Sequence, residues 1–404
     1  MIVVGCGSLV LLCLLGYSEL ERFIDEVDAP THSINTGLVL ANTRFGFKLL
    51  AEIHRQDDSE NIFISPLSVS TALAMTYNGA AGETQQAMAK ALELEEMTPQ
   101  EVNSANAELR KSLENPDPKV ELIIANSLWA RQGVEFKTNF LQRNRQFFGA
   151  EIATLDFNDP QAPGIINQWV DTNTRGKVQK IVEDIDPRMV MFLINATYFK
   201  GIWQVEFDKS KTKEGIFHLP GGRGKQVPMM SQSGKYPYYW SESFQAVSLP
   251  YGGGRISLYL FLPDEGHSLI DFLRNLNQEN WEQWMSLFRQ MEGDITLPRF
   301  KLEYDEDLDG ALKALGMEAA FDPDKANFGG MRSERDLFIQ RVKHKAVVEV
   351  NEEGTEAAAV TSVEVGVTSV PEIFTIVVDR PFFFAIRDNQ TGTVLFMGVV
   401  IEPK

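Results

Sequence analysis

The residues best suited to nucleophilic or acid–base chemistry are thinly scattered along the 404-residue chain. None of the five histidines forms an HxH or HExxH pair, so we expect no metal site. The chain also lacks a GxSxG elbow and a phosphate-binding loop. Ser65, Asn195 and His344 are the residue types of a hydrolase triad, but each lies in an apolar strand-like or helix-start context. That context favours buried, hydrogen-bonded polar groups, so we expect neither catalysis nor a cofactor.

Residues 354–371 carry a pattern that points to another kind of chemistry. The uncharged set of alternate positions is Thr355, Ala357, Ala359, Thr361, Val363 and Val365. The other set holds both glutamates, Glu356 and Glu364, which is the period-two pattern of a strand with one buried face. An ordinary amphipathic strand would also show it. The small residues at 355–359 are what a strand needs to enter between two existing strands without steric conflict.

The composition is that of a soluble globular protein, with 44% hydrophobic and 23% charged residues. The length corresponds to roughly one large domain or two ordinary ones. Lys and Arg total 38 against 56 Asp and Glu, a net charge of −18. This acidic balance argues against nucleic acid and polyanions as main partners.

The N-terminus differs from the rest of the chain. Residues 2–16 are uncharged and almost entirely apolar, a run of signal-peptide length and too short for a comfortable membrane span. No Lys or Arg precedes it, so the usual basic region is missing. We interpret 1–18 as a signal peptide or a membrane anchor and 19–34 as a linker. The expected localisation is secreted or extracytoplasmic, with anchoring through 2–16 as the alternative.

Both cysteines, Cys6 and Cys13, lie within that apolar run. The remainder of the chain therefore has neither a disulfide nor a zinc–thiolate site. A domain of this size can be stabilised by burial alone.

Hydrophobic periodicity predicts helices mostly in the first half of the chain and strands mostly in the second. The expected helices cover 42–54, 68–77, 83–92, 101–114 and 165–174. The expected strands cover 120–129, 189–198, 245–250, 255–262, 293–299, 345–351, 373–378, 382–387 and 394–401. Together they predict one large α+β domain with extensive sheets.

Five segments, in order, resemble the serpin family from about residue 37 to the C-terminus. They are 61–69 (NIFISPLSV), 192–203 (FLINATYFKGIW), 342–359 (VKHKAVVEVNEEGTEAAA), 379–384 (DRPFFF) and 395–398 (LFMG). The resemblance implies a serpin domain over 35–404, with three β-sheets, about nine helices and an exposed reactive centre loop at about 352–371.

The resemblance also implies a mechanism, that of an irreversible suicide-substrate inhibitor of an antitrypsin-like kind. The loop is attacked by a serine protease, and the cut loop then inserts into the large sheet while still joined to the enzyme as an acyl ester. The partner is therefore a target serine protease held in a covalent complex, and we expect the inhibitor itself to be a monomer. No basic run resembles a heparin-binding helix, because 97–116 is acidic to neutral.

Matching the family position by position places the hinge at Gly354, Thr355, Glu356, Ala357, Ala358 and Ala359. The reactive bond then falls at Thr368–Ser369, with Val367–Thr368 as the alternative. Small or β-branched residues there suit an elastase-like pocket or a chymotrypsin-class target, and the absence of Arg or Lys disfavours trypsin-like enzymes.

Two buried clusters are also implied by the resemblance. Ser65, Ser68, Asn195 and His344 match the shutter, a polar cluster beneath the opening of the large sheet. Trp203, Glu352 and Arg299 match the breach, where insertion begins, with Arg299 in place of the more familiar lysine. Ordinary core packing is the alternative for each of these residues.

Two other functions remain open at this stage. A non-inhibitory serpin would act as a carrier, chaperone or storage protein, and often has bulky or charged hinge residues. The same loop would also support cross-class inhibition of a cysteine protease.

Overall fold

The computed structural model describes residues 34–186, 188–334, 336–354 and 373–404. Residues 35–404 form one compact unit in which helices and sheets are mixed, so the predicted α+β class is confirmed. Within the described residues the strands form two hydrogen-bonded sheets. Two of the three expected sheets are continuous, because the long strand β6 (Gly224–Trp240) pairs with β9 along its middle and with β7 at its end.

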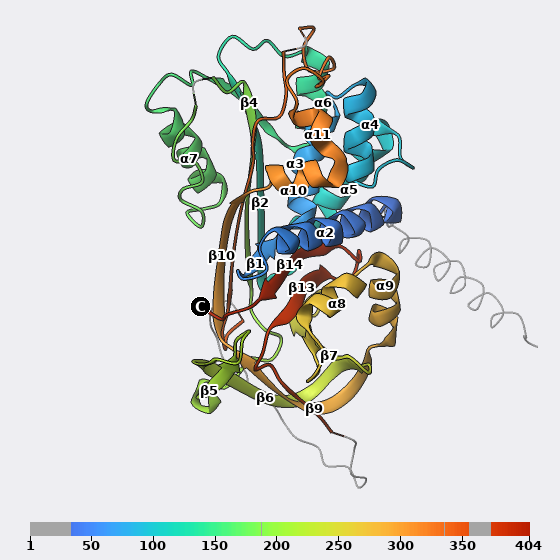
Figure 1. The fold of residues 1–404 in the computed structure, drawn as a ribbon, viewed down its shortest axis with the longest axis vertical. Helices are drawn as coiled ribbons and strands as arrows, with labels where there is room; N and C mark the ends of the chain where they lie inside the picture. Colours follow the sequence, from blue (N-terminus) through green and yellow to red (C-terminus); the bar gives the residue numbers. More distant parts are fainter. Residues whose placement is uncertain (1–33, 187, 335, 355–372) are drawn as a thin grey trace, which may run out of the picture. The chain divides into compact units, whose positions relative to one another are not determined.

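The five-stranded sheet has the order β10-β11-β4-β2-β3 (Figure 1). Its strands are β10 (Phe300–Asp307), β11 (Val342–Val350), β4 (Met191–Gly201), β2 (Val120–Arg131) and β3 (Glu151–Leu155). The two central neighbours, β4 and β11, run parallel, whereas β10–β11 and β2–β4 are antiparallel. All but two residues of β4 are buried, which fits the unbroken apolar run in its sequence.

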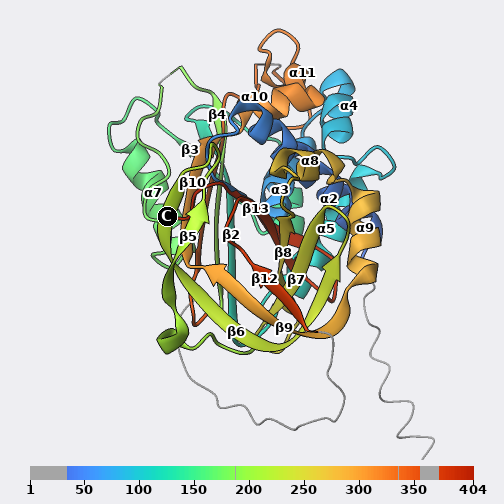
Figure 2. The same ribbon diagram turned by 60° about the horizontal axis from the view of Figure 1, so that its bottom comes forward.

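The nine-stranded sheet has the order β1-β14-β13-β8-β7-β6-β9-β12, and β5 pairs with β6 off this path. Besides β6, its strands are β1 (Ile62–Ile64), β5 (Lys213–His218), β7 (Phe244–Tyr251), β8 (Ile256–Pro263), β9 (Arg289–Pro298), β12 (Phe374–Val377), β13 (Phe382–Asp388) and β14 (Val394–Val400). Figure 2 shows β6, β9 and β12 side by side at one end of the unit. The strand β12 is the first element after the loop and pairs parallel to β9.

The helices of the described residues are α2 (Thr36–Gln56), α3 (Pro66–Tyr77), α4 (Gly82–Ala91), α5 (Pro99–Leu113), α6 (Thr138–Phe148), α7 (Ala162–Asn173), α8 (Leu269–Asn275), α9 (Gln278–Leu287), α10 (Asp309–Leu312) and α11 (Glu318–Phe321), with short turns η1 (Lys209–Lys211) and η2 (Lys313–Met317). Five of these helices, α2, α3, α5, α8 and α9, begin at a residue whose side chain caps the first turn. Thr98 and Glu101 form a capping box at the start of α5. Gly149 ends α6 in the left-handed conformation.

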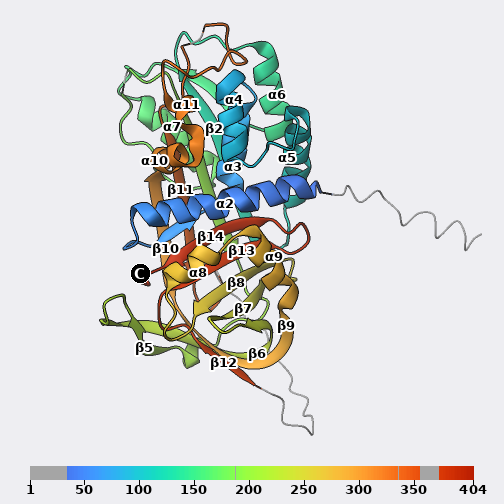
Figure 3. The same cartoon turned by 45° about the vertical axis from the view of Figure 1, so that its right-hand side comes forward.

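Helix α2 lies between the helices α3 and α5 and the strand β14 (Figure 3). Helix α3 is buried on nearly every side and contacts both β4 and β2. Because it is buried nearly all round, its sequence shows no single apolar stripe. We call the face of the five-stranded sheet that packs against α3 the inner face.

The opposite, outer face of that sheet is covered by α7 and the segment after it. A cluster there joins Ile166 and Val170 of α7 with Trp129 of β2 and with Phe192 and Ile194 of β4. Successive residues of a strand point to opposite faces, so Phe192 and Ile194 face outward while Leu193 and Asn195 face inward. Figure 1 shows α7 on one side of the sheet and α3 on the other.

Candidate functional site

Four residues predicted to form the shutter lie together on the inner face. Ser65 is the N-cap of α3, and its hydroxyl accepts a hydrogen bond from the Ser68 backbone N–H at 3.3 Å. The same hydroxyl donates to the Leu395 carbonyl of β14 at 2.7 Å. All four side chains are buried, with 1% exposure or less. The fixed start of α3 thus aims its first turn at the centre of the sheet.

His344 joins α3 to the central strands as a neutral imidazole. Its Nε2 accepts from the Ser65 backbone N–H at 3.2 Å, so the ring proton is on Nδ1. Nδ1 then donates to the Asn195 side-chain oxygen. Complete burial lowers the pKa of His344 to about 3, only partly opposed by the charge of Asp305, so the ring stays uncharged at neutral pH.

Asn195 completes the cluster and adds a residue that the sequence did not reveal. Its amide group donates to the Ser68 hydroxyl and to the side chain of Asn126 on β2. Asn126 pairs directly with Asn195 in the β2–β4 register, which only the sheet pairing discloses. The cluster therefore spans α3, β2, β4 and β11.

This arrangement does not support a hydrolase. The Ser65 hydroxyl donates to a backbone carbonyl, and His344 bonds the Ser65 backbone rather than its hydroxyl. A nucleophile needs a base within reach of its own proton and access to a substrate, and neither condition is met. No group of three or more potential metal ligands occurs in the described part of the chain.

The shutter lies across the seam between β4 and β11, the one parallel contact at the centre of the sheet. The described register runs from Leu193 opposite Val342 to Tyr198 opposite Val347. His344 and Asn195 are direct partners in it, so their side-chain hydrogen bond crosses the seam. Any strand that entered here would have to break that bond.

The chain reverses direction immediately after β11. Asn351 and Gly354 exchange two backbone hydrogen bonds, at 3.2 and 3.1 Å, around the two-residue loop of Glu352 and Glu353. Gly354 has φ +98°, a conformation that favours glycine. The turn is attached to the end of β4, because Trp203 N–H donates to the Glu353 carbonyl at 3.1 Å. The turn from Asn351 to Gly354 is thus fixed beside the end of β4, the strand on the other side of the seam.

Trp203, predicted for the breach, holds this turn. Its indole N–H donates to the Asn351 carbonyl at 2.9 Å. The ring stacks on Tyr251 with centroids 4.3 Å apart, and it is 2% exposed. Tyr251 was not predicted, because the pairing of Trp203 with β7 has no local sequence signal.

Glu352 and Arg299 form the predicted ion pair, at 2.6 Å. Thr212, a further unpredicted residue, donates to the same carboxylate at 2.6 Å. Burial pushes the pKa of Glu352 upward, but the hydrogen bonds from Arg299 and Thr212 outweigh it and leave the pKa below its usual value. The carboxylate is charged at neutral pH and anchors the turn to β9–β10 and to the start of β5.

The remaining predicted positions lie outside the described residues. They are the hinge residues Thr355, Glu356, Ala357, Ala358 and Ala359 and the reactive bond Thr368–Ser369. Of the predicted hinge, the structure therefore places only Gly354.

Comparison with known proteins identifies the family. The model for "Serpin (serine protease inhibitor)" matches residues 40–403. This chain belongs to the serpin family. It is 36% identical to the leukocyte elastase inhibitor of Equus caballus over 381 residues, covering 91% of this chain and 99% of the relative. Serpin B6 of Pongo abelii is 35% identical, with 91% and 99% covered.

A solved structure agrees with these relatives. The thermophilic serpin tengpin, in its native state, is 34% identical and superposes with a TM-score of 0.83, covering 90% of this chain and 94% of tengpin. The predicted serpin fold is therefore confirmed. The family is one of serine protease inhibitors, so membership indicates protease inhibition as the general function.

The predicted localisation is wrong. Relatives at 35–36% identity include leukocyte elastase inhibitors and Serpin B6, which belong to an intracellular group of the family. No helix in the described ranges is long and apolar enough to cross a membrane, and residues 2–16 lie outside those ranges. The prediction relied on the length and apolarity of 2–16 although no basic residue precedes that run.

The buried neutral His344 predicts a specific pH dependence of stability. Below pH about 6.5 the unfolded chain binds a proton that the folded chain, with its pKa near 3, does not bind. The contribution is complete above pH 6.5 and is lost as the pH falls toward 3. Between pH 6 and 5 the free energy of unfolding should fall by up to about 1.4 kcal/mol per pH unit through this residue.

Chemical denaturation of the wild type and His344→Gln between pH 6.5 and 5 measures how much of the pH dependence of the unfolding free energy comes from His344. Most carboxyl groups titrate below that window. The slope should flatten relative to the wild type. His54→Gln is the matched control. His54 is also buried, and burial lowers its pKa, but the charges of Asp58 and Asp57 oppose that shift. Its replacement should therefore flatten the slope less than His344→Gln does. A slope that His344→Gln leaves unchanged would contradict the neutral assignment.

The turn at Gly354 can be tested by comparing two glycines of similar φ. A Cβ on Gly354 would lie 2.4 Å from both the Gly201 oxygen and the Trp203 nitrogen, whereas one on Gly133, at φ +92°, would meet no atom within 4 Å. Gly133→Ala should cost only the conformational strain, about 1–2 kcal/mol. Gly354→Ala should cost clearly more in guanidinium unfolding. Equal losses would mean that the turn is not clamped on β4.

Proposed function

We propose that this serpin is an irreversible suicide-substrate inhibitor whose cut loop enters the five-stranded sheet between β4 and β11. The observation that carries the proposal is the two-residue turn between Asn351 and Gly354 at the end of that seam. The protease would attack the bond Thr368–Ser369 and form an acyl-enzyme. The loop would then carry the bound protease along the sheet before the ester is hydrolysed.

The direction of the strands supports this path. The chain reverses after β11, so a strand that continued from this turn between the parallel β4 and β11 would be antiparallel to both and would enter from the end where both strands finish. The turn delivers the chain to that end. About 15 loop residues at roughly 3.3 Å each would reach about 50 Å along the sheet.

The loop sequence supports insertion as well. Continuing the pairing of Asn351 with Gly354 brings Thr355, Ala357 and Ala359 to the inner face, where the side chains of the seam are buried. Small uncharged residues enter such a face with little steric cost. The protein with the five-stranded sheet would be metastable. Insertion would lower its free energy, because the new strand forms ladder hydrogen bonds and buries side chains.

We further propose an elastase- or chymotrypsin-like target. Thr368 and the neighbouring Val367 are small or β-branched, which suits a shallow apolar specificity pocket. The relatives named leukocyte elastase inhibitor point to the same class. A carrier role would tolerate a bulky or charged hinge, and the alanines at 357–359 favour inhibition instead.

Incubation with pancreatic elastase should give a covalent complex that survives SDS, because the acyl ester is trapped before hydrolysis. Gel electrophoresis and mass spectrometry of the released C-terminal peptide report both the complex and the cut position. Clean cleavage without a complex would refute inhibition. A peptide beginning elsewhere than Ser369 or Thr368 would refute the assigned bond.

Thr355→Arg should convert the inhibitor into a substrate. A charged side chain directed to the buried inner face would oppose the first step of insertion. The loop should still be cut, with little or no complex formed. Thr368→Val is the matched control in the same loop, because it keeps a small β-branched residue at the bond and should retain inhibition. Full inhibition by Thr355→Arg would contradict insertion.

A further inference from the structure

A cavity of about 720 Å³ lies on the outer face, directly over the seam. One wall is Phe192 and Ile194 of β4. The other is Lys343 and Lys345 of β11 together with Arg341, which directly precedes that strand. Residues 180–186 form its roof. It therefore lies where the outward side chains of a strand inserted between β4 and β11 would project.

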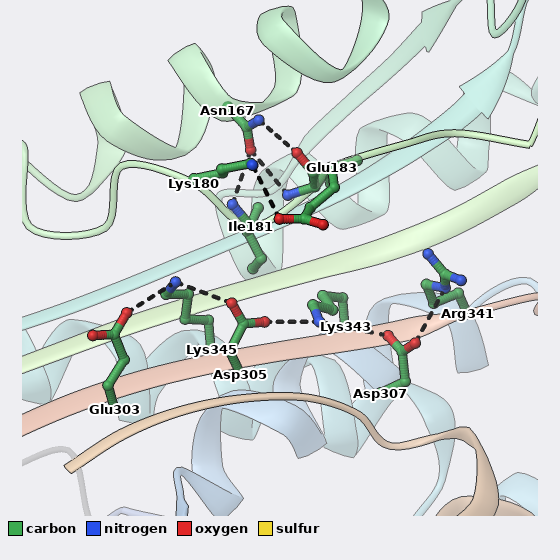
Figure 4. A network of polar contacts seen from close by, with 11 residues as sticks. Asn167, Lys180, Ile181, Glu183, Glu303, Asp305, Asp307, Arg341, Lys343 and Lys345 are labelled. Atoms are coloured by element: carbon green, nitrogen blue, oxygen red, sulfur yellow. Dashed lines mark hydrogen bonds and ion pairs between the residues drawn. The ribbon is translucent and has the colours of Figure 1, made fainter.

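The roof is attached to the β4 side of the seam. Ile181 and Val182 pack into the cluster that contains Phe192 and Ile194. Asn167 of α7 holds the roof through three hydrogen bonds to the backbone of Ile181 and Val182, at 2.7 to 3.0 Å (Figure 4). Helix α7, the roof and β4 thus form one apolar block.

The β11 side is held by charge instead. Bases on β11 alternate with acids on β10 along the outer face, a set that we call the charge ladder (Figure 4). Its ion pairs are Arg341–Asp307 at 3.4 Å, Lys343–Asp307 at 4.0 Å, Lys343–Asp305 at 2.7 Å, Lys345–Asp305 at 3.0 Å and Lys345–Glu303 at 3.1 Å. Burial disfavours the charged form of Lys345, but Asp305 and Glu303 outweigh it and raise its pKa. The ladder binds β11 to β10 without linking it to β4.

The turn fixes which loop residue meets which base. Opposite residues in an antiparallel pair share a face. If the inserted loop continued the pairing of Asn351 with Gly354, Lys345 would lie opposite Val360 and Lys343 opposite Ser362. The next outward pair would be Arg341 opposite Glu364. Of Glu356 and Glu364, only Glu364 would then reach the basic wall of the cavity.

We propose that this cavity is the receiving site for Glu364, whose carboxylate pairs with Arg341 when the cut loop inserts. The inference rests on the proposed insertion of the loop. Arg341 is suited to the role because its side chain is 39% exposed and its pair with Asp307 is long. A guanidinium has five N–H donors, so it can bind a second carboxylate without releasing the first. The pair would hold the far half of the inserted strand in register.

A double-mutant cycle tests this pairing in the inserted state. The wild type, Glu364→Gln, Arg341→Met and the double variant are cut with a non-target protease at a bond after Glu364, verified by mass. Guanidinium unfolding of intact and cut forms gives the stability gained on cutting. Either single variant should reduce that gain by about two- to fivefold in the equilibrium constant, typical of a partly exposed ion pair. The double variant should lose no more than the larger single loss.

Glu303→Gln is the matched control. It removes a ladder acid of the same type on β10, which an inserted strand would not face, so it should leave the gain unchanged. Additive losses, or a wild-type gain in Glu364→Gln, would overturn the pairing while loop insertion stands. A wild type that gains nothing on cutting would overturn insertion and, with it, this inference.

Discussion

The parallel contact between β4 and β11 is the constraint on which the other features depend. A strand can join two parallel neighbours as an antiparallel partner of both only if it comes from the end where both finish. The turn at Asn351–Gly354 stands at that end. Trp203 and the Glu352–Arg299 pair have a common effect, because each fixes this turn against the ends of β4, β9 and β10.

The two sides of the seam are stabilised by different forces. The β4 side is an apolar block with α7 on its outer face, and the β11 side is tied to β10 by the charge ladder. Side chains cross the seam on the inner face through the hydrogen bond of a neutral His344 to Asn195. Such a boundary can open without cutting through either block. Opening it breaks the backbone pairing of β4 with β11 as well as the His344–Asn195 hydrogen bond, but leaves the burial within each block intact.

Much of the fold and both buried clusters could be predicted because five local motifs resemble one family in the correct order. What stayed hidden depends on pairing between distant segments. Strand β6 was missed because Pro228 and Pro237 lie within it, and proline disfavours sheet interiors. The role of Asn126 is recognisable only from its pairing with Asn195. The acids of β10 resemble an ordinary solvent-exposed face in the sequence, and only the pairing with β11 shows that they face bases. Export was inferred from the length and apolarity of residues 2–16 and was wrong.

A disulfide across the seam would test loop insertion most directly. Thr197 and Ala346 are buried partners in the β4–β11 register and are close to cysteine in size, so Thr197→Cys with Ala346→Cys can bridge the strands. Cys6 and Cys13 would be replaced by serine. Insertion between β4 and β11 predicts that the oxidised protein is cut by its target protease without forming an SDS-stable complex, and that reduction restores the complex. Equal complex formation with the disulfide intact would contradict it.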